Sequence, residues 1–182
     1  MKHLILLRHG DCSNSKPYPL TPKGVTQYET LGDDIKTVTN DGSSHIITSP
    51  AIRAYQGGLI LPQKLKTVSP VEKLLFLWDA TDKPEEYEGK KVGTDDLYYY
   101  MSFYTPKEAK EKLERIVDER ANLADVLIMI SHKDLIYQFC HYYTDKHFGR
   151  AESFSFEYGE GVHLDLETKK CIKLPLPVNP DK

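Results

Sequence analysis

Short, mainly apolar runs that end in polar residues recur along the chain. Three of them stand out, and they cover residues 4–7, 45–48 and 126–130. The polar residues that follow them are Arg8-His9-Gly10, Ser49-Pro50 and Ser131-His132-Lys133. An apolar run of this length is typical of a strand buried on both faces of a parallel sheet. The pattern therefore predicts three buried strands, each with polar side chains just beyond its end.

Apolar residues at helical spacing separate these runs. Thr21 suits an N-cap and Pro22 the first helical position, and apolar or aromatic side chains then recur at residues 25, 28, 31 and 35. The clearest helical pattern covers residues 106–122, where an apolar stripe runs between Lys and Glu residues. Further helices are expected at 51–64 and 135–143, and further strands at 66–69, 161–166 and 171–174.

The alternation of strands and helices predicts an α/β fold, a three-layer α/β/α sandwich with a mostly parallel sheet. The length of 182 residues fits a single domain over residues 1–182. Residues 79–104 mix charges, glycines and three consecutive tyrosines, and we interpret them as a loop-rich excursion from that domain. In such a fold the ligand site lies off the carboxyl ends of the strands, so the three polar strand ends are expected to converge there.

Composition narrows the classes of function. The formal net charge is -3, which argues against a non-specific binder of nucleic acid or of an anionic membrane but leaves room for a local basic pocket. Cys12, Cys140 and Cys171 are widely spaced and form no CxxC pair, so no zinc knuckle is predicted. No run is long enough for a signal peptide or a membrane span. We therefore expect a cytoplasmic protein with free thiols and no membrane partner.

The predicted strand ends, with the helix after the second strand, supply two histidines and two arginines to one edge. Singly, Arg53 would be interpreted as a solvated helix charge, and His9 or His132 as a structural histidine. Together they suit phosphoryl chemistry, because arginines bind phosphate oxygens in a bidentate manner and a neutral imidazole nitrogen is a nucleophile. The combination, rather than any one residue, indicates a phosphate site built from Arg8, His9, Arg53 and His132.

Four ordered motifs over residues 3–140 carry a family resemblance. They are LLRHG at 6–10, PLTPKG at 19–24 with Gln27, TSPAIRAYQ at 48–56 and ISH at 130–132. On these motifs the chain resembles the histidine phosphatase superfamily, the phosphoglycerate-mutase-like proteins. Its small size is similar to that of the branch that contains the phosphohistidine phosphatases.

The resemblance implies a phosphatase that hydrolyses a phosphomonoester or a phosphohistidine. His9 would be the nucleophile and would form a covalent phosphohistidine intermediate. Arg8, Arg53 and His132 would bind the phosphate, with His132 also stabilising its charge as a hydrogen-bond donor. Neither a metal nor another cofactor is implied. The expected partner is a phosphorylated small molecule or a phosphoprotein, and not a nucleic acid.

The chain departs from the family pattern at two places. The proton donor to the leaving group is not obvious: Asp79 is the first candidate and Glu72 the second, although Asp79 can equally cap the turn that follows it. In larger family members a phosphate-binding asparagine stands at the position of Ser15, one residue after Asn14, and we expect Asn14 or Ser15 to contact the phosphate. An uncertain donor keeps open an alternative, a phospho-ligand or partner-binding protein of the same fold with little or no turnover.

Overall fold

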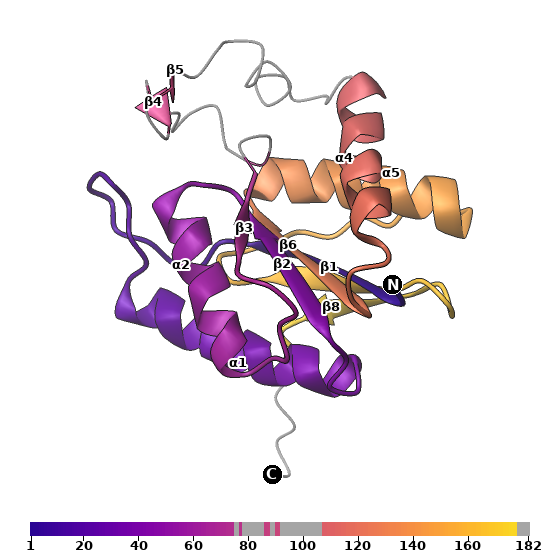
Figure 1. Cartoon of the computed structure of the whole chain (residues 1–182), viewed down its shortest axis with the longest axis horizontal. Coiled ribbons are helices and arrows are strands. Elements are labelled where there is room, and N and C mark those ends of the chain that lie inside the picture. The colour runs from indigo at the N-terminus through magenta and orange to yellow at the C-terminus, as the bar shows by residue number, and fades with distance from the viewer. Residues whose placement is uncertain (75–76, 78–85, 88–89, 92–106, 178–182) are drawn as a thin grey trace.

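Helices and strands alternate along the chain in a computed structural model, which describes residues 1–74, 77, 86–87, 90–91 and 107–177 (Figure 1). The elements are β1 (His3–Arg8), α1 (Pro22–Val38), β2 (Ser44–Thr48), α2 (Ile52–Ile60), the 3-10 helix η1 (Leu61–Gln63), β3 (Glu72–Lys73), β4 (Glu86–Tyr87), β5 (Lys90–Lys91), α4 (Lys107–Arg120), β6 (Val126–Ser131), α5 (Lys133–Phe148), β7 (Gly161–Asp165) and β8 (Lys170–Leu174). The mixed α/β class predicted from the sequence is confirmed. The excursion predicted at 79–104 lies almost wholly outside the described residues.

The central sheet has six strands in the order β3-β2-β6-β1-β7-β8. Strands β3, β2, β6 and β1 pair in parallel, whereas β7 is antiparallel to β1 and β8 is antiparallel to β7. The prediction of a mostly parallel sheet therefore holds for one part of the sheet only. For β8 the reason is the tight turn that joins it to β7, in which the Asp165 carboxylate accepts hydrogen bonds from two backbone N–H groups, because so short a connection allows only antiparallel pairing.

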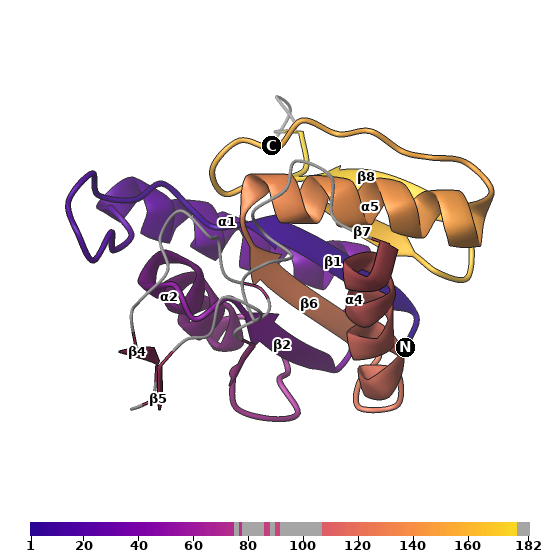
Figure 2. The same ribbon diagram turned by 90° about the horizontal axis from the view of Figure 1, so that it is seen from above.

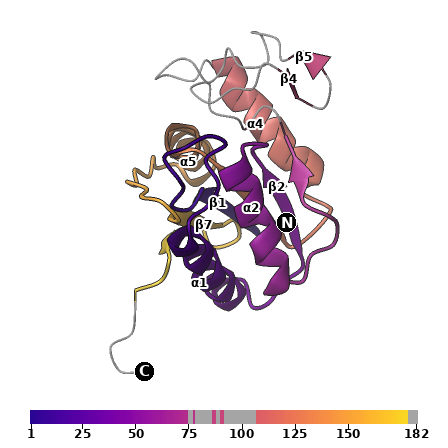
Figure 3. The same cartoon turned by 90° about the vertical axis from the view of Figure 1, so that its left-hand side faces the viewer.

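Helices pack on both faces of this sheet (Figures 2 and 3). Alternate residues of β1 show why: Leu4 and Leu6 join the apolar cluster with α4 and α5, while Ile5 and Leu7 join the cluster with α1 and α2. Successive side chains of a strand point to opposite faces, so an unbroken apolar run must be covered on both sides. Two apolar clusters thus enclose the sheet between them.

The strand expected at 66–69 is wrong in position. Only Thr67 forms an isolated bridge, with Ser44, and regular pairing begins later at β3. Pro70 explains the delay, because it has no N–H group to donate to a neighbouring strand.

The apolar stripe of α1 is confirmed for all but one of its residues. Thr21 caps the helix by accepting a hydrogen bond from the Gly24 backbone N–H, and residues 28, 31 and 35 are fully buried. Val25 is instead 36% exposed. The first turn packs through Gly24, where a Cβ atom would lie 2.1 Å from the Asp11 carbonyl oxygen, and this contact leaves Val25 on the solvent side.

The strand ends converge as the sequence predicts. In the parallel register Arg8 lies beside Ser131, and Thr48 lies beside Ile130. Because β1, β6 and β2 are neighbours, the residues that follow them, His9, His132 and Ser49, leave the sheet at the same edge.

Candidate active site

Two histidines and two arginines meet at this edge. His9 directly follows β1, His132 is the N-cap of α5, and Arg53 lies in the first turn of α2. All three are buried, with exposed fractions of 5%, 5% and 7% respectively. The two imidazole rings lie 5.2 Å apart between centroids, in an edge-to-face arrangement. Residues from three separate parts of the sequence, Arg8 and His9 among them, therefore lie together at this edge.

Arg53 links the two histidines. Its Nε donates to His9 Nε2 at 3.1 Å, and its Nη2 lies 3.3 Å from His132 Nδ1. The opposite ring nitrogens have other partners, since His9 Nδ1 lies 2.9 Å from the Gly10 carbonyl oxygen and His132 Nε2 lies 3.0 Å from Ser49 Oγ. Both nitrogens of each ring are engaged.

These partners fix the tautomers of both rings. A carbonyl oxygen only accepts, so His9 carries its proton on Nδ1, and a guanidinium only donates, so His9 Nε2 presents a lone pair. The same reasoning places the His132 proton on Nε2, where it is donated to Ser49. Both imidazoles are therefore neutral.

Burial keeps them neutral. Burial, together with the charges of Arg53 and Arg8, lowers the pKa of His9 to about 3, against the opposing effect of the Gly10 hydrogen bond. Burial also lowers the pKa of His132 well below its usual value, assisted by His9 and Arg53. An unprotonated imidazole nitrogen beside two guanidinium groups is the electronic state that a nitrogen nucleophile requires.

The backbone around His9 is held on both sides. The His9 N–H donates to the Ser131 carbonyl at 3.0 Å, and the Gly159 N–H donates to the His9 carbonyl at 3.0 Å. The Tyr28 hydroxyl donates to the Arg8 carbonyl at 3.1 Å. These hydrogen bonds hold the backbone of Arg8 and His9 in place, and with it the His9 imidazole.

The second motif of the sequence has a structural role beside the site. Gln27 accepts a hydrogen bond from the Asp11 N–H at 2.8 Å and donates to the Tyr158 carbonyl at 2.7 Å. Gln56 of the third motif accepts from the Leu20 N–H at 2.7 Å. The loop after His9 is therefore tied to α1, α2 and the turn before β7.

Sequence reasoning missed the turn before β7, residues 156–160. Arg8 Nη1 donates to the Phe156 carbonyl at 3.0 Å, and the Arg8 guanidinium carbon lies 3.8 Å from the centroid of the Tyr158 ring. One partner is a backbone carbonyl 148 positions away in the sequence, and the other is the aromatic ring of Tyr158 close to it. No residue pattern signals either contact, apart from Gly159 two residues before the start of β7.

One predicted site residue, Asn14, is not brought into this group. Asn14 is exposed in the loop at 11–20, and in the described part of the chain no hydrogen bond joins it to Arg8, His9, Arg53 or His132. Tyr18 from the same loop reaches the group, with its ring centroid 5.8 Å from the Arg53 guanidinium carbon. Asp79 lies outside the described residues.

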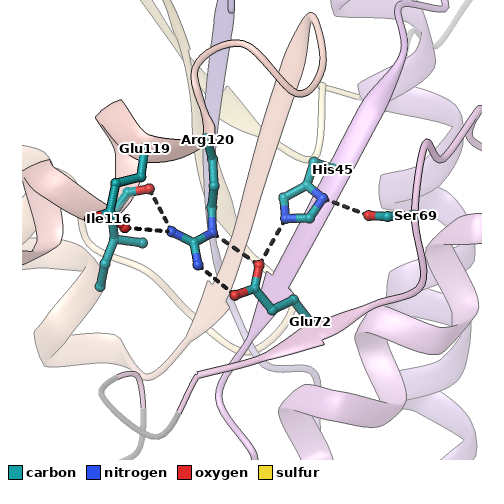
Figure 4. Close-up of polar contacts among 6 residues, drawn as sticks. All are labelled: His45, Ser69, Glu72, Ile116, Glu119 and Arg120. Carbon is teal, nitrogen blue, oxygen red and sulfur yellow. Dashed lines mark hydrogen bonds and ion pairs between the residues drawn. The ribbon is translucent and has the colours of Figure 1, made fainter.

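Glu72, the second donor candidate, belongs to a different cluster (Figure 4). Its carboxylate accepts two hydrogen bonds from Arg120 and lies 3.0 Å from His45 Nε2, while His45 Nδ1 lies 2.7 Å from Ser69 Oγ. The Arg120 hydrogen bonds lower the pKa of Glu72. An ionised carboxylate has no proton to donate, so Glu72 is unsuited to act as a general acid.

The arrangement suits an anion. Arg8 and Arg53 bring two positive charges to a largely dehydrated edge, and the N-terminus of the 16-residue α5 begins there at His132. Within residues 1–74 and 107–177 and the short described pieces between them, no group of three His, Cys, Asp or Glu side chains could hold a metal ion. A phosphoryl group with its charged oxygens matches the donors that are present.

Solved structures of phosphatases share this fold. The ecdysone phosphate phosphatase EPPase from Bombix mori, in complex with tungstate, matches with a TM-score of 0.64 and 14% identity over 100% of this chain and 96% of that chain. The protein histidine phosphatase SixA, complexed with tungstate, matches with a TM-score of 0.58 and 16% identity over 94% and 93%. A mutant of phosphoserine phosphatase from Entamoeba histolytica, in complex with phosphoserine, gives 0.56 and 14% over 96% and 95%.

Sequence comparison adds no nearer relative. No family model matches the chain, and no curated protein sequence matches it. At identities of 14–16% the structural likeness shows a shared fold over nearly the whole length of each chain.

Proposed function

The chain has the fold of the histidine phosphatases, and from this premise we propose that it is a phosphatase with His9 as its nucleophile. The substrate is a phosphomonoester or a phosphohistidine, on a small molecule or a protein. The observation that carries the proposal is the His9 Nε2 lone pair, unprotonated and beside the guanidinium of Arg53. Two of the structural neighbours hold tungstate, an oxyanion analogue of phosphate, and this supports the choice of ligand.

Binding begins with the two arginines. Arg53 Nε and Nη2 are directed at the two imidazoles, and phosphoryl oxygens that enter the pocket compete for these donors. When Arg53 turns to the phosphate, the His9 Nε2 lone pair is released toward phosphorus. Positioning and charge stabilisation are the main contributions an enzyme makes to phosphoryl transfer, and two guanidinium groups supply both.

Transfer then proceeds in two displacements. His9 Nε2 forms a bond to phosphorus while the bond to the leaving oxygen or nitrogen breaks, and the Gly10 carbonyl, which accepts a hydrogen bond from Nδ1–H, stabilises the positive ring. Water next attacks phosphorus and gives up a proton to the carboxylate that protonated the leaving group, and His9 leaves as a neutral imidazole. His132 donates its Nε2 proton to a phosphoryl oxygen that displaces Ser49, and so stabilises the charge that develops on the oxygens.

The proton for the leaving group is assigned to Asp79. This assignment rests on the family resemblance of the segment that contains it. The mechanism uses no metal ion, because the arginines supply the positive charge that a metal supplies in other phosphatases. The odd number and wide spacing of the cysteines fit action in the cytoplasm.

One observation favours a second candidate, a phospho-ligand binder with little turnover. Arg53 Nε donates a hydrogen bond to His9 Nε2, so the lone pair that the mechanism needs for attack is already engaged. A protein in which Arg53 keeps that position when phosphate binds would hold the ligand without reacting.

Hydrolysis of an aryl phosphate tests the proposal, because its good leaving group makes the proton donor unnecessary. We expect wild-type protein to hydrolyse p-nitrophenyl phosphate, with vanadate inhibiting the reaction and EDTA leaving it unchanged. His9→Ala should lower kcat by at least about 10³-fold, the scale of losing a nucleophile. His141→Ala, which changes an exposed histidine of α5, is the matched control.

Three results would count against the proposal. Wild-type turnover that survives in His9→Ala would remove His9 as nucleophile. Loss of activity in EDTA that a divalent metal restores would point to another mechanism. Tight phosphate binding without any hydrolysis would favour the binding protein.

A further inference from the structure

The plane of the Arg8 guanidinium is set mainly by an aromatic ring. Among the described residues the side chain makes one hydrogen bond, from Nη1 to the Phe156 carbonyl at 3.0 Å, and its Nε is buried without a partner. The Glu157 carboxylate is 4.0 Å from Nη1 and its side chain is 71% exposed. A single hydrogen bond leaves the guanidinium free to tilt. The Tyr158 ring, 3.8 Å from the guanidinium carbon, restrains that tilt.

The same ring contacts the nucleophile. The centroids of Tyr158 and His9 are 5.3 Å apart, with an angle of 41° between the ring planes. Tyr158 therefore lies against the phosphate-binding arginine and the reacting histidine at once, although 39% of the residue is exposed. A tyrosine that only filled surface space would not need to contact both groups.

The turn that carries Tyr158 is rigidly anchored to the site. Its carbonyl accepts from Gln27 Nε2 at 2.7 Å, the Gly159 N–H donates to the His9 carbonyl at 3.0 Å, and the Arg8 N–H donates to the Glu160 carbonyl at 2.8 Å. Gly159 has a φ of +71°, and a Cβ there would lie 2.7 Å from Gln27 Cβ, so the turn requires glycine.

The path of the chain explains how this turn reaches the site. The connection from α5 to β7 returns along α5 from the far end of the sheet (Figure 2), and it arrives beside Arg8 just before β7 pairs with β1. The ring is thus placed by the sheet pairing and by α1 together.

We propose that Tyr158 is a positioning residue of the phosphate site, whose ring face holds the Arg8 guanidinium in the plane that directs its remaining N–H groups to the phosphoryl oxygens. The inference rests on the proposed function only in taking phosphate as the ligand of Arg8. It requires no turnover, and it is therefore tested by binding.

The affinity for inorganic phosphate, measured by titration calorimetry, tests this role. Tyr158→Leu should weaken binding roughly 2–30-fold, the range of a cation–π contact. Tyr158→Phe keeps the ring face and should bind within about twofold of wild type. Tyr137→Leu removes a tyrosine of α5 that is equally exposed, at 39%, and should leave the affinity unchanged.

A double-mutant cycle with Arg8→Ala separates positioning from direct contact. If Tyr158 acts through Arg8, adding Tyr158→Leu to Arg8→Ala causes no further loss of affinity. Equal losses in both backgrounds, or wild-type affinity in Tyr158→Leu, would overturn the inference. Thermal melts check that the Leu variant folds, and Tyr158→Met replaces it if it does not.

The outcomes keep this inference apart from the proposed function. Wild-type protein that binds phosphate but hydrolyses nothing refutes the phosphatase, and the affinity ratios still decide the role of Tyr158. Wild-type protein that binds no phosphate overturns the role of Tyr158, because Arg8 then has no anion to meet.

Discussion

At the scale of single residues, the site depends on keeping two imidazoles uncharged next to two guanidinium groups. Arg53 donates to both rings, and this is possible only while each ring offers a lone pair. Burial and the positive neighbours remove any affinity for an extra proton in the neutral range. Burial therefore keeps the imidazole of His9 in the neutral state that a nucleophile needs.

This predicts a pH dependence of stability. In the unfolded chain His9 has a pKa near 6.5, and in the folded protein its pKa is about 3. Below pH 6.5 His9 binds a proton in the unfolded chain but stays unprotonated in the folded protein, so the free energy of unfolding falls as the pH falls. Between pH 7 and pH 5 His9 alone should lower the free energy of unfolding by about 2 kcal/mol.

Urea unfolding of wild type and His9→Gln at pH 7, 6 and 5 measures this contribution. The variant lacks the titrating ring, so its free energy of unfolding should fall by about 2 kcal/mol less over the same range. His141→Gln controls for the loss of a histidine as such. Parallel curves for wild type and His9→Gln would show that His9 is not held neutral by the fold.

The sequence predicted that Arg8, His9, Arg53 and His132 meet at one edge of the sheet, and the structure brings them together there, while their roles in phosphate chemistry stay predictions. It could not predict the contacts of Arg8 with residues 156–158, since a carbonyl and a ring face leave no pattern in a linear chain. The contact expected of Asn14 depended on the path of the loop at 11–20. That path presents Tyr18 to Arg53 and leaves Asn14 exposed.

At the scale of elements, α4 is fastened by two charged clusters. Arg120 in its last turn donates two hydrogen bonds to Glu72 of β3. Earlier in the helix, Glu114 is only 7% exposed and accepts from Lys146 and Tyr142 of α5. These contacts join α4 to the edge strand of the sheet and to the neighbouring helix.

Removing one partner of the Glu72 cluster should loosen this edge. Arg120→Met should lower the free energy of unfolding by about 1.5–3 kcal/mol, the usual contribution of hydrogen bonds to a charged group. Arg150→Met, at an Arg–Glu pair whose arginine side chain is 59% exposed, is the control and should cost less than about 1 kcal/mol. Chemical denaturation measures both, and equal losses would contradict a structural role for the cluster.

Element prediction succeeded where the apolar pattern was continuous. Strands β1 and β6 are buried along their whole length apart from the half-buried ends of β1 and match the expected runs. Strand β3 was misplaced, because its two residues, Glu72 and Lys73, carry no apolar signal and are fixed only by pairing with β2. The local sequence shows the periodicity of a strand, but it does not show which strand that segment pairs with.

At the scale of the whole molecule, topology creates the site. The sheet order places β1 between β6 and β7, so the C-terminal hairpin and the central parallel strands both border His9. The same architecture is kept in neighbours at 14–16% identity. Among the described residues, no helix is both long and apolar enough to cross a bilayer.

The central claim is that phosphate is carried covalently on His9, and trapping that adduct tests it most directly. The protein is quenched in alkali during turnover of an aryl phosphate, because the acid-labile P–N bond of phosphohistidine survives there. Mass spectrometry then locates the phosphorylated peptide. The account predicts one phosphate on the peptide that contains His9, at the Nε2 position, and none in His9→Ala. Phosphate on another residue, or turnover with no phosphoprotein detected in wild type, would contradict it.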